Sequence, residues 1–158
     1  MVAENIIVPV TEPTDWVHPI VIAPKSNGDI RVCMDPRSLN TYIKREIFQI
    51  PTQDTLFSEL SGAQYFSLLD ASNAFLQIPL DHKSSLLCTI STPFGRYRYL
   101  RLPYGLSSAP EIFQKFMFDT LNDLTGVIAY FDDILVFGKT IEEHNLNLER
   151  TLQRITKS

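Results

Sequence analysis

The segment AYFDDILVF, residues 129–137, constrains the fold more than any other part of the chain. Two adjacent aspartates, Asp132 and Asp133, interrupt a run of residues that is otherwise typical of buried β-structure. Taking a carboxylate out of water costs several kcal/mol unless a counter-charge is present. The pattern therefore predicts two strands within residues 127–137 that meet at a bend, with both aspartates at the bend and a cation beside them.

A third aspartate ends another apolar segment, YFSLLD at residues 65–70. If one sheet places this strand beside the bend, Asp70 joins Asp132 and Asp133 at the same edge. Hard oxygen ligands of this kind suit magnesium or manganese, and two such ions can activate an attacking oxygen and stabilise a leaving one in phosphoryl transfer. The ordinary alternative is an exposed turn at Asp132 and Asp133 and a helix cap at Asp70, because aspartate is frequent in both positions.

The remaining patterns predict short strands and helices in alternation. Prolines near the start exclude a helix there, and the turn signal SNGD favours a β-hairpin over residues 20–34. The other expected elements are a helix over 52–60, strands over 86–90 and 96–102, a helix from the capping box Ser108–Glu111, and a helix from the capping box Thr140–Glu143. The last helix carries the apolar stripe Ile141, Leu148, Leu152 and Ile155, which either packs back on the sheet or awaits a partner segment. The sequence thus predicts an α+β domain, with an antiparallel sheet and packed helices.

Composition excludes several classes of protein. With 158 residues, 44% hydrophobic and 20% charged, the chain is long enough for one domain with a core. Cys33 and Cys88 lie far apart without a CxxC motif, which favours free thiols in a reducing, intracellular setting. No apolar run reaches the roughly 18 residues that a membrane span needs, so no membrane partner is expected. The three histidines are isolated, and we assign none of them to a metal.

Two further patterns bear on phosphate binding. GKT at residues 138–140 resembles the end of a P-loop, but that motif requires glycine at position 133, where this chain has Asp133. The formal charge of −4 argues weakly against a nucleic-acid partner. Lysines and arginines nevertheless cluster in three segments, so local basic strips remain open beside the alternative of merely solvated charges.

Several blocks together resemble the reverse transcriptase of gypsy-type LTR retrotransposons. They are DIRVCMDPRSLN at 29–40, LLDASNAFLQIPL at 68–80, FGRYRYLRLPYGLSSAPEIFQKFM at 94–117 and YFDD at 130–133. The likeness covers nearly the whole chain, and the order and spacing of the blocks make it specific. It implies the fingers and palm of a right-hand polymerase within a single domain, with residues 1–62 and 80–103 fingers-like, residues 63–79 and 104–158 palm-like, and an end before the thumb.

The resemblance also implies roles for single residues. Asp70 and Asp132 would ligate two Mg²⁺ ions, with Mn²⁺ as a substitute, and Asp133 would assist as a further metal-site carboxylate. The primer 3′-hydroxyl would attack the α-phosphate of a dNTP and release pyrophosphate. The remaining matches are Lys25 and Arg31 to the fingers positions that hold the triphosphate, Arg37 to a template contact, Phe75 to the residue that blocks a ribose 2′-hydroxyl, and Tyr104 to a wall of the nucleotide pocket. From the residues alone, Phe75 is better explained as a core aromatic.

Departures from the family pattern keep other functions open. PKSNGD retains only Lys25 where the family commonly has a run of lysines, and Ala74 replaces a frequent glycine. A non-catalytic relic or nucleic-acid-binding fragment is one alternative. An RNA-dependent RNA polymerase palm is another, although that family typically has glycine where this chain has Phe131. The expected partners are an RNA or DNA template with primer, a dNTP, and the thumb and RNase H segments of a longer polyprotein. The expected location is intracellular, in a cytoplasmic retroelement particle or also in the nucleus. We expect weak or no activity for the fragment alone.

Overall fold

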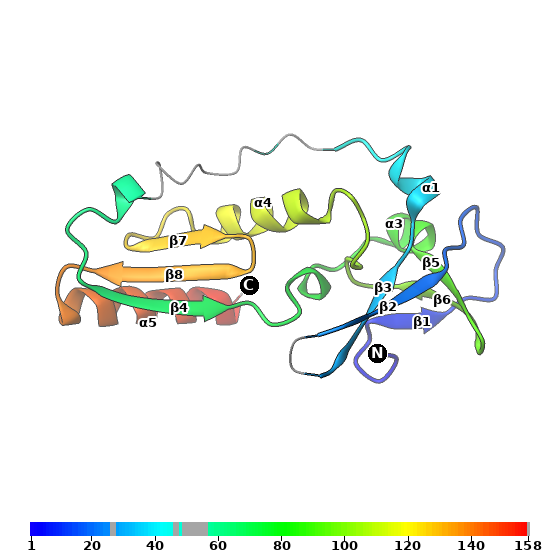
Figure 1. Cartoon of the computed structure of the whole chain (residues 1–158), viewed down its shortest axis with the longest axis horizontal. Coiled ribbons are helices and arrows are strands. Elements are labelled where there is room, and N and C mark those ends of the chain that lie inside the picture. The colour runs from blue at the N-terminus through cyan, green and yellow to red at the C-terminus, as the bar shows by residue number, and fades with distance from the viewer. Residues whose placement is uncertain (26–27, 46–47, 49–56, 158) are drawn as a thin grey trace. The chain divides into compact units, whose positions relative to one another are not determined.

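The computed structural model describes residues 1–25, 28–45, 48 and 57–157. Within it the chain forms two compact units, each assembled from two separate segments. Met1–Arg45 and Asn73–Ala109 make the first unit, and Glu46–Ser72 and Pro110–Ser158 make the second. The chain therefore passes between the units three times. Figure 1 shows the elements of both units, coloured along the sequence.

The first unit contains two small antiparallel sheets. One has the strand order β1 (Ile7–Pro9), β6 (Gly95–Tyr99) and β5 (Thr89–Thr92), and the other pairs β2 (Ile20–Pro24) with β3 (Ile30–Met34). Its helical elements are α1 (Arg37–Asn40), η1 (Ala74–Gln77) and α3 (His82–Leu87). The β2–β3 register runs from Ile20 opposite Met34 to Pro24 opposite Ile30, which confirms the predicted hairpin. Positions 26 and 27 of its turn lie outside the described residues.

The strand expected over residues 86–90 begins only at Thr89. Asp81 caps the helix α3, since its carboxylate accepts hydrogen bonds from the backbone N–H of Ser84 at 3.0 Å and from the Ser84 hydroxyl at 2.7 Å. This N-cap satisfies an otherwise unpaired helical N–H group and carries the helix to Leu87. The next strand, expected over 96–102, is β6 and ends at Tyr99.

The second unit is built on a three-stranded antiparallel sheet. Its strand order is β4 (Tyr65–Asp70), β8 (Asp133–Gly138) and β7 (Val127–Tyr130). Among its described residues are the helices α4 (Ala109–Leu121) and α5 (Ile141–Lys157), and residues 57–59 are helical as well. The structure confirms the strand over 65–70 and the strand pair within 127–137. Ile134 and Val136 of β8 are buried in the core with Phe113, Met117 and Leu121 of α4. Of the helix expected over 52–60, residues 52–56 lie outside the described residues.

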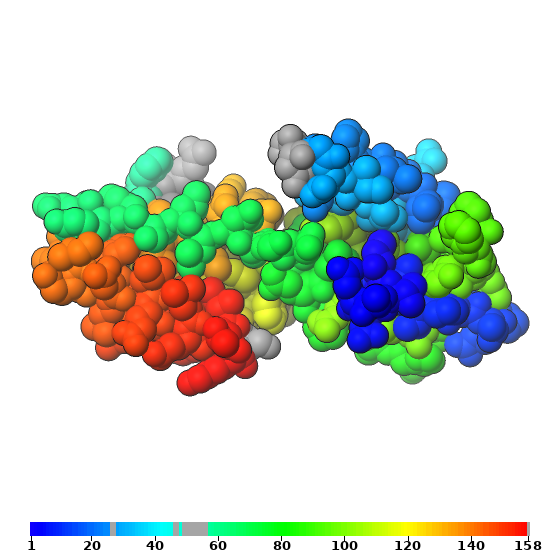
Figure 2. Space-filling view, turned by 90° about the horizontal axis from the view of Figure 1, so that it is seen from below, coloured from blue at the N-terminus to red at the C-terminus, as the bar shows by residue number. Residues whose placement is uncertain are grey.

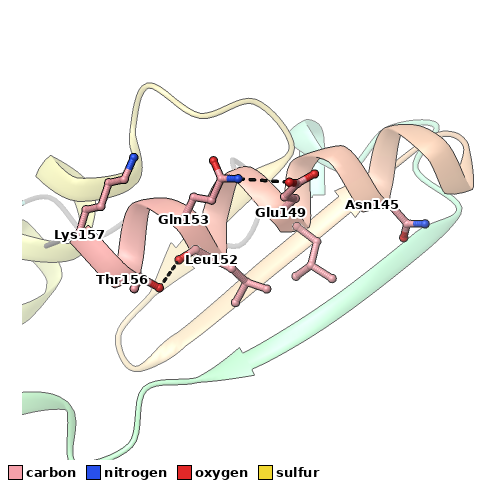
Figure 3. A pocket seen from close by; sticks show the side chains of 7 residues that line it. Asn145, Glu149, Leu152, Gln153, Thr156 and Lys157 are labelled. Atoms are coloured by element: carbon pink, nitrogen blue, oxygen red, sulfur yellow. Dashed lines mark hydrogen bonds between the residues drawn. The ribbon is translucent and has the colours of Figure 1, made fainter.

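Helix α5 packs against β4 and β8, but with its polar face. The side chains of His144, Asn147 and Thr151 are buried, whereas Ile141, Leu152 and Ile155 of the predicted apolar stripe are 43%, 47% and 37% exposed. Figure 2 shows this helix, in orange to red, on the outer surface of the second unit. Leu152 and Leu148 line a shallow hollow there, beside a hydrogen bond from Gln153 to Glu149 (Figure 3). Within the described residues the stripe does not pack back on the sheet.

Contacts at the end of β8 determine that α5 packs on the sheet with its polar face. A Cβ atom on Gly138 would lie 2.5 Å from the backbone nitrogen of His144, so the helix approaches the strand more closely than a side chain would permit. Asn147 Nδ2 then donates to the Phe137 carbonyl oxygen at 2.9 Å, and the Ser67 hydroxyl bonds His144 Nε2 at 2.9 Å. The Thr140–Glu143 cap is present: Glu143 N donates to Thr140 Oγ1, while the Glu143 carboxylate accepts from Lys139 N.

The boundaries of the two units fall at different residues from the fingers-like and palm-like ranges expected from the sequence. The segment after Pro103, expected to be palm-like, joins the first unit up to Ala109. The Tyr104 carbonyl accepts from Met34 N at 2.9 Å, and Ser107 N donates to Asn40 Oδ1 at 3.0 Å, which ties this segment to β3 and α1. Naming the individual units as fingers and palm stays a proposal. No helix in the described part of the chain is long and apolar enough to cross a membrane.

Candidate catalytic site

The register of the second sheet brings Asp70 and Asp133 opposite each other. They are the last antiparallel pair between β4 and β8, at the end of the sheet where β7 and β8 are joined. Directly opposed residues point to the same face, with Cβ atoms roughly 4.5–5.5 Å apart. Both side chains are exposed. The two carboxylates therefore lie at one end and on one face of the sheet.

Asp132 lies in the two-residue loop that joins Tyr130 of β7 to Asp133 of β8. Its carbonyl oxygen accepts a hydrogen bond from Ala71 N at 2.8 Å, so the loop is tied to the residue after Asp70. Phe131, the other loop residue, has a φ of 53°, in the left-handed region that short hairpin turns usually fill with glycine. The backbone thus brings all three aspartates to one end of the sheet through a strained turn.

The chemistry of these donors fits a hard divalent cation. Carboxylate oxygens are the ligands that Mg²⁺ and Mn²⁺ prefer, and none of the three aspartates forms an ion pair with another described residue. The described residues include no group of three His, Cys, Asp or Glu side chains close enough to hold a metal ion. The three aspartate side chains therefore do not form a closed cluster. The arrangement is an open, solvent-facing set of acidic groups with their backbones in register.

Sequence reasoning missed one residue of this site, Gln114 on α4. Its side chain is 1% exposed, its Nε2 donates to the Ala129 carbonyl oxygen at 3.0 Å, and its Oε1 accepts from Phe131 N at 2.6 Å. A signal was present, since Gln114 lies three residues before Met117 and seven before Leu121, on the buried face of the helix. A polar side chain on such a face requires partners, and here they are backbone groups of the aspartate hairpin.

Three of the predicted nucleotide-binding residues meet in the first unit. The Arg31 guanidinium lies over the Tyr104 ring, 4.6 Å from its centroid, and the rings of Phe75 and Tyr104 are 5.0 Å apart. Gly105 fixes this position of Tyr104, because a Cβ atom there would lie 1.9 Å from the Met34 carbonyl oxygen and the residue has a φ of 115°. Arg31, Phe75 and Tyr104 form one cation–aromatic cluster.

The other two predicted contacts lie elsewhere in the first unit. Lys25 follows β2, where its backbone N–H donates to the Asp29 carbonyl at 2.7 Å. Arg37, at the start of α1, contacts both oxygens of Asp35, through Nε at 3.1 Å and through Nη2 at 2.9 Å. The Arg37 side chain is 87% exposed, so its guanidinium is oriented by Asp35 yet open to solvent.

Comparison with known proteins identifies the protein family. Residues 23–158 match the family model described as reverse transcriptase (RNA-dependent DNA polymerase). This chain belongs to the reverse transcriptase family, and the resemblance to gypsy-type retrotransposon sequences is confirmed at that level.

Two curated relatives and one solved structure make the match specific. The chain is 41% identical over 153 residues to the uncharacterized protein K02A2.6 of Caenorhabditis elegans, covering 95% of this chain and 12% of the relative. It is 32% identical over 163 residues to the retrovirus-related Pol polyprotein from transposon opus of Drosophila melanogaster, covering 100% of this chain and 16% of the relative. The structure of a foamy viral protease-reverse transcriptase in complex with double-stranded DNA has the same fold, with a TM-score of 0.89, 24% identity, and coverage of 99% of this chain and 27% of that one. The chain thus spans a small part of its relatives. Its fold of helices and antiparallel sheets matches part of the reverse transcriptase structure.

Proposed function

We propose that this chain carries the metal-binding and nucleotide-binding residues of an RNA-directed DNA polymerase. Asp70 and Asp132 would hold two divalent cations, with Asp133 assisting. The observation that carries the proposal is the register, which pairs Asp70 with Asp133 and leaves Asp132 at the turn, hydrogen-bonded to Ala71. Membership of the reverse transcriptase family supports the same assignment.

The reaction is nucleotidyl transfer. A bond forms between the primer 3′-oxygen and the α-phosphorus of a dNTP, the bond to the β-phosphate oxygen breaks, pyrophosphate leaves, and the hydroxyl proton passes to solvent. The cations, when bound, neutralise charge on the attacking and leaving oxygens. The part of the protein is to hold these groups in line, since misplacement of the attacking oxygen forfeits much of the rate.

The first unit would bind the incoming nucleotide. Lys25 and Arg31 would contact the triphosphate, with Arg31 already oriented by its contact with Tyr104. Tyr104 would form a wall of the nucleotide pocket, and Phe75, packed on it, would exclude a ribose 2′-hydroxyl. Arg37 would contact a template phosphate from its position beside Asp35.

The partners would be a template with its primer. Structures of similar fold hold double-stranded DNA and an RNA/DNA hybrid, which supports RNA or DNA as template. The relatives are far longer than this chain, which supports thumb and RNase H segments supplied by a longer polyprotein. An intracellular retroelement particle is the setting we propose, and the free thiols Cys33 and Cys88 are compatible with it.

Binding of Mn²⁺ to the purified chain, followed by electron paramagnetic resonance of the free ion, tests the metal site. We expect affinity in the millimolar range, lost in Asp70→Asn and Asp132→Asn. Asp119→Asn removes one exposed carboxylate from α4 of the same unit and is the matched control, with affinity unchanged. Equal binding by the control and by Asp132→Asn would show that the ion does not use the predicted residues.

Primer extension with magnesium separates the polymerase from the alternative, a non-catalytic relic or nucleic-acid-binding fragment. We expect little or no extension by residues 1–158 alone, because the net charge of −4 weakens unaided binding of a duplex. A version extended through the thumb should synthesise DNA, and Asp132→Asn should abolish that synthesis. If the extended protein binds template and primer but is inactive with or without Asp132, the relic is the better description.

A further inference from the structure

The aspartate hairpin has one free edge, and a side chain covers part of it. Strand β7 is an outermost strand of the sheet, so its outward N–H and C=O groups have no neighbouring strand among the described residues. Gln114 spans two of these groups, the Ala129 carbonyl and the Phe131 N–H. Its amide provides one donor and one acceptor, as a residue of an adjacent strand would. Gln114 therefore acts as a one-residue extension of the sheet at the tip of the hairpin.

The tip is where the backbone is strained. Phe131 has a φ of 53°, which is unfavourable for a bulky side chain and is maintained only where surrounding contacts impose it. One of these contacts is the bond from Phe131 N to Gln114 at 2.6 Å. Another is the bond from Ala71 N to the Asp132 carbonyl at 2.8 Å. The turn is thus held from α4 on one side and from the segment after β4 on the other.

We propose that Gln114 is a positioning residue that holds Asp132 in place relative to Asp70. The dihedral angles of Phe131 set the direction in which the chain leaves β7, and hence where Asp132 lies relative to Asp70. Without the Gln114 amide, two backbone groups lose their partners and the turn relaxes towards geometries that suit a bulky residue. Asp132 then moves away from Asp70. The predicted effect on metal affinity rests on the proposed function. The predicted effect of Gln114 on the geometry of the turn does not.

The main variant is Gln114→Met, which keeps the length and volume of the side chain and removes both hydrogen bonds. The measurements are amide hydrogen exchange at Phe131 by NMR and Mn²⁺ affinity by electron paramagnetic resonance. We expect faster exchange at Phe131 and affinity lowered by about tenfold, the size of effect typical of residues that orient metal ligands. Leu121→Ala is the matched control, because Leu121 is 3% exposed, lies about two turns beyond Gln114 in the same helix, and has an apolar side chain that forms no hydrogen bond. It should lower stability and leave Mn²⁺ affinity unchanged.

A rescue experiment distinguishes positioning from general support of the fold. Glycine accepts a positive φ without strain, so Phe131→Gly in the Gln114→Met background should restore most of the lost Mn²⁺ affinity. A loss of affinity that arises from a loosened helix would not respond to glycine at position 131. If Gln114→Met does not fold, Gln114→Asn, whose amide is one methylene too short to reach both groups, takes its place with the same readouts.

The outcomes are distinct. Unchanged exchange at Phe131 in the folded Gln114 variant, or equal weakening of Mn²⁺ binding by Leu121→Ala, overturns the proposal. So does failure of Phe131→Gly to restore affinity. If the unmodified chain binds no Mn²⁺, the proposed metal site fails, and exchange at Phe131 alone decides: acceleration in Gln114→Met supports the positioning role, and its absence refutes it.

Discussion

Tyr99 offers a stability prediction with an unusual sign. The side chain is fully buried in β6, and its hydroxyl has no hydrogen-bond partner among the described residues. A buried, unsatisfied polar group costs about 1–3 kcal/mol. Tyr99→Phe removes that group and keeps the packed ring, so we expect it to raise the free energy of unfolding at pH 7 by about 1 kcal/mol. Replacing a buried tyrosine whose hydroxyl is bonded has the opposite effect.

The same residue predicts a pH dependence. Burial, with a smaller effect of the Cys33 and Cys88 thiols, raises the pKa of the Tyr99 phenol from 10.0 to about 12. Because the unfolded phenol ionises near pH 10 and the folded one does not, ionisation stabilises only the unfolded chain at first. The free energy of unfolding is therefore unaffected by Tyr99 ionisation below pH 10 and falls as pH rises towards 12. At pH 11, one pH unit above the unfolded pKa, the loss is about 1 kcal/mol, because each pH unit between the two pKa values lowers stability by about 1.36 kcal/mol. Burial also raises the pKa of Cys88 from 9.0 to about 12, so the whole protein weakens further over pH 9 to 12.

Urea denaturation of the wild type, Tyr99→Phe and Tyr97→Phe at pH 7 and pH 11 tests both parts. Tyr97 lies on the same strand and is only half buried, which makes it the matched control. Tyr99→Phe should be the more stable protein at pH 7, and its advantage should grow by about 1 kcal/mol at pH 11. A loss of more than about 1 kcal/mol at pH 7 would show that the hydroxyl is satisfied, for instance by an internal water, and would refute the reasoning.

Three further predictions concern other parts of the molecule. Gly105→Ala should destabilise the first unit by about 3 kcal/mol or prevent its folding, because the new Cβ meets the Met34 carbonyl oxygen; denaturation measures this, and stability equal to the wild type would contradict the close approach. Asp81→Asn should flatten the acid limb of a thermal melting series, since hydrogen bonds from Ser84 lower the pKa of Asp81 below 3.8 and the stability they confer is lost as pH falls through that lowered value. Phe75→Val in a version extended through the thumb should increase ribonucleotide incorporation relative to deoxynucleotides, and an unchanged ratio in steady-state assays would mean that Phe75 is not the gate.

Local pattern predicted those elements whose signals lie within a few residues. The β2–β3 hairpin, β4 and the β7–β8 pair followed from turn residues and apolar runs, and the position of Asp70 opposite Asp133 follows once β4 and β8 pair. The predicted start of β5 was wrong because the helix capped by Asp81 includes Leu86 and Leu87, although their apolar side chains suit a strand. The cap consists of hydrogen bonds between Asp81 and Ser84, and a pattern of apolar residues does not reveal them.

Features that depend on distant partners were harder to predict. Amphipathic analysis assumes that the apolar stripe of a helix is its buried face. In α5 the neighbours are the Phe137 carbonyl and the Ser67 hydroxyl, so the hydrogen-bonding side chains Asn147 and His144 are buried instead. Gln114 was missed for the related reason that its partners are backbone atoms of a strand later in the chain.

The three crossings between the units determine when each can form during synthesis. Strand β1 pairs with β6, so Ile7 cannot pair until Tyr99 has been synthesised. Strand β4 likewise cannot pair until β8 follows, some sixty residues later. When residues 1–90 of this segment have left a ribosome, the β2–β3 hairpin is the one sheet in the described part of the chain whose strands are both present. Pairings of such long separation are slow, because loop-closure entropy is lost before the contacts that repay it form. The nascent chain therefore exposes the apolar strand β4 until the aspartate hairpin emerges to cover its edge, which makes that interval the one in which chaperones are most needed.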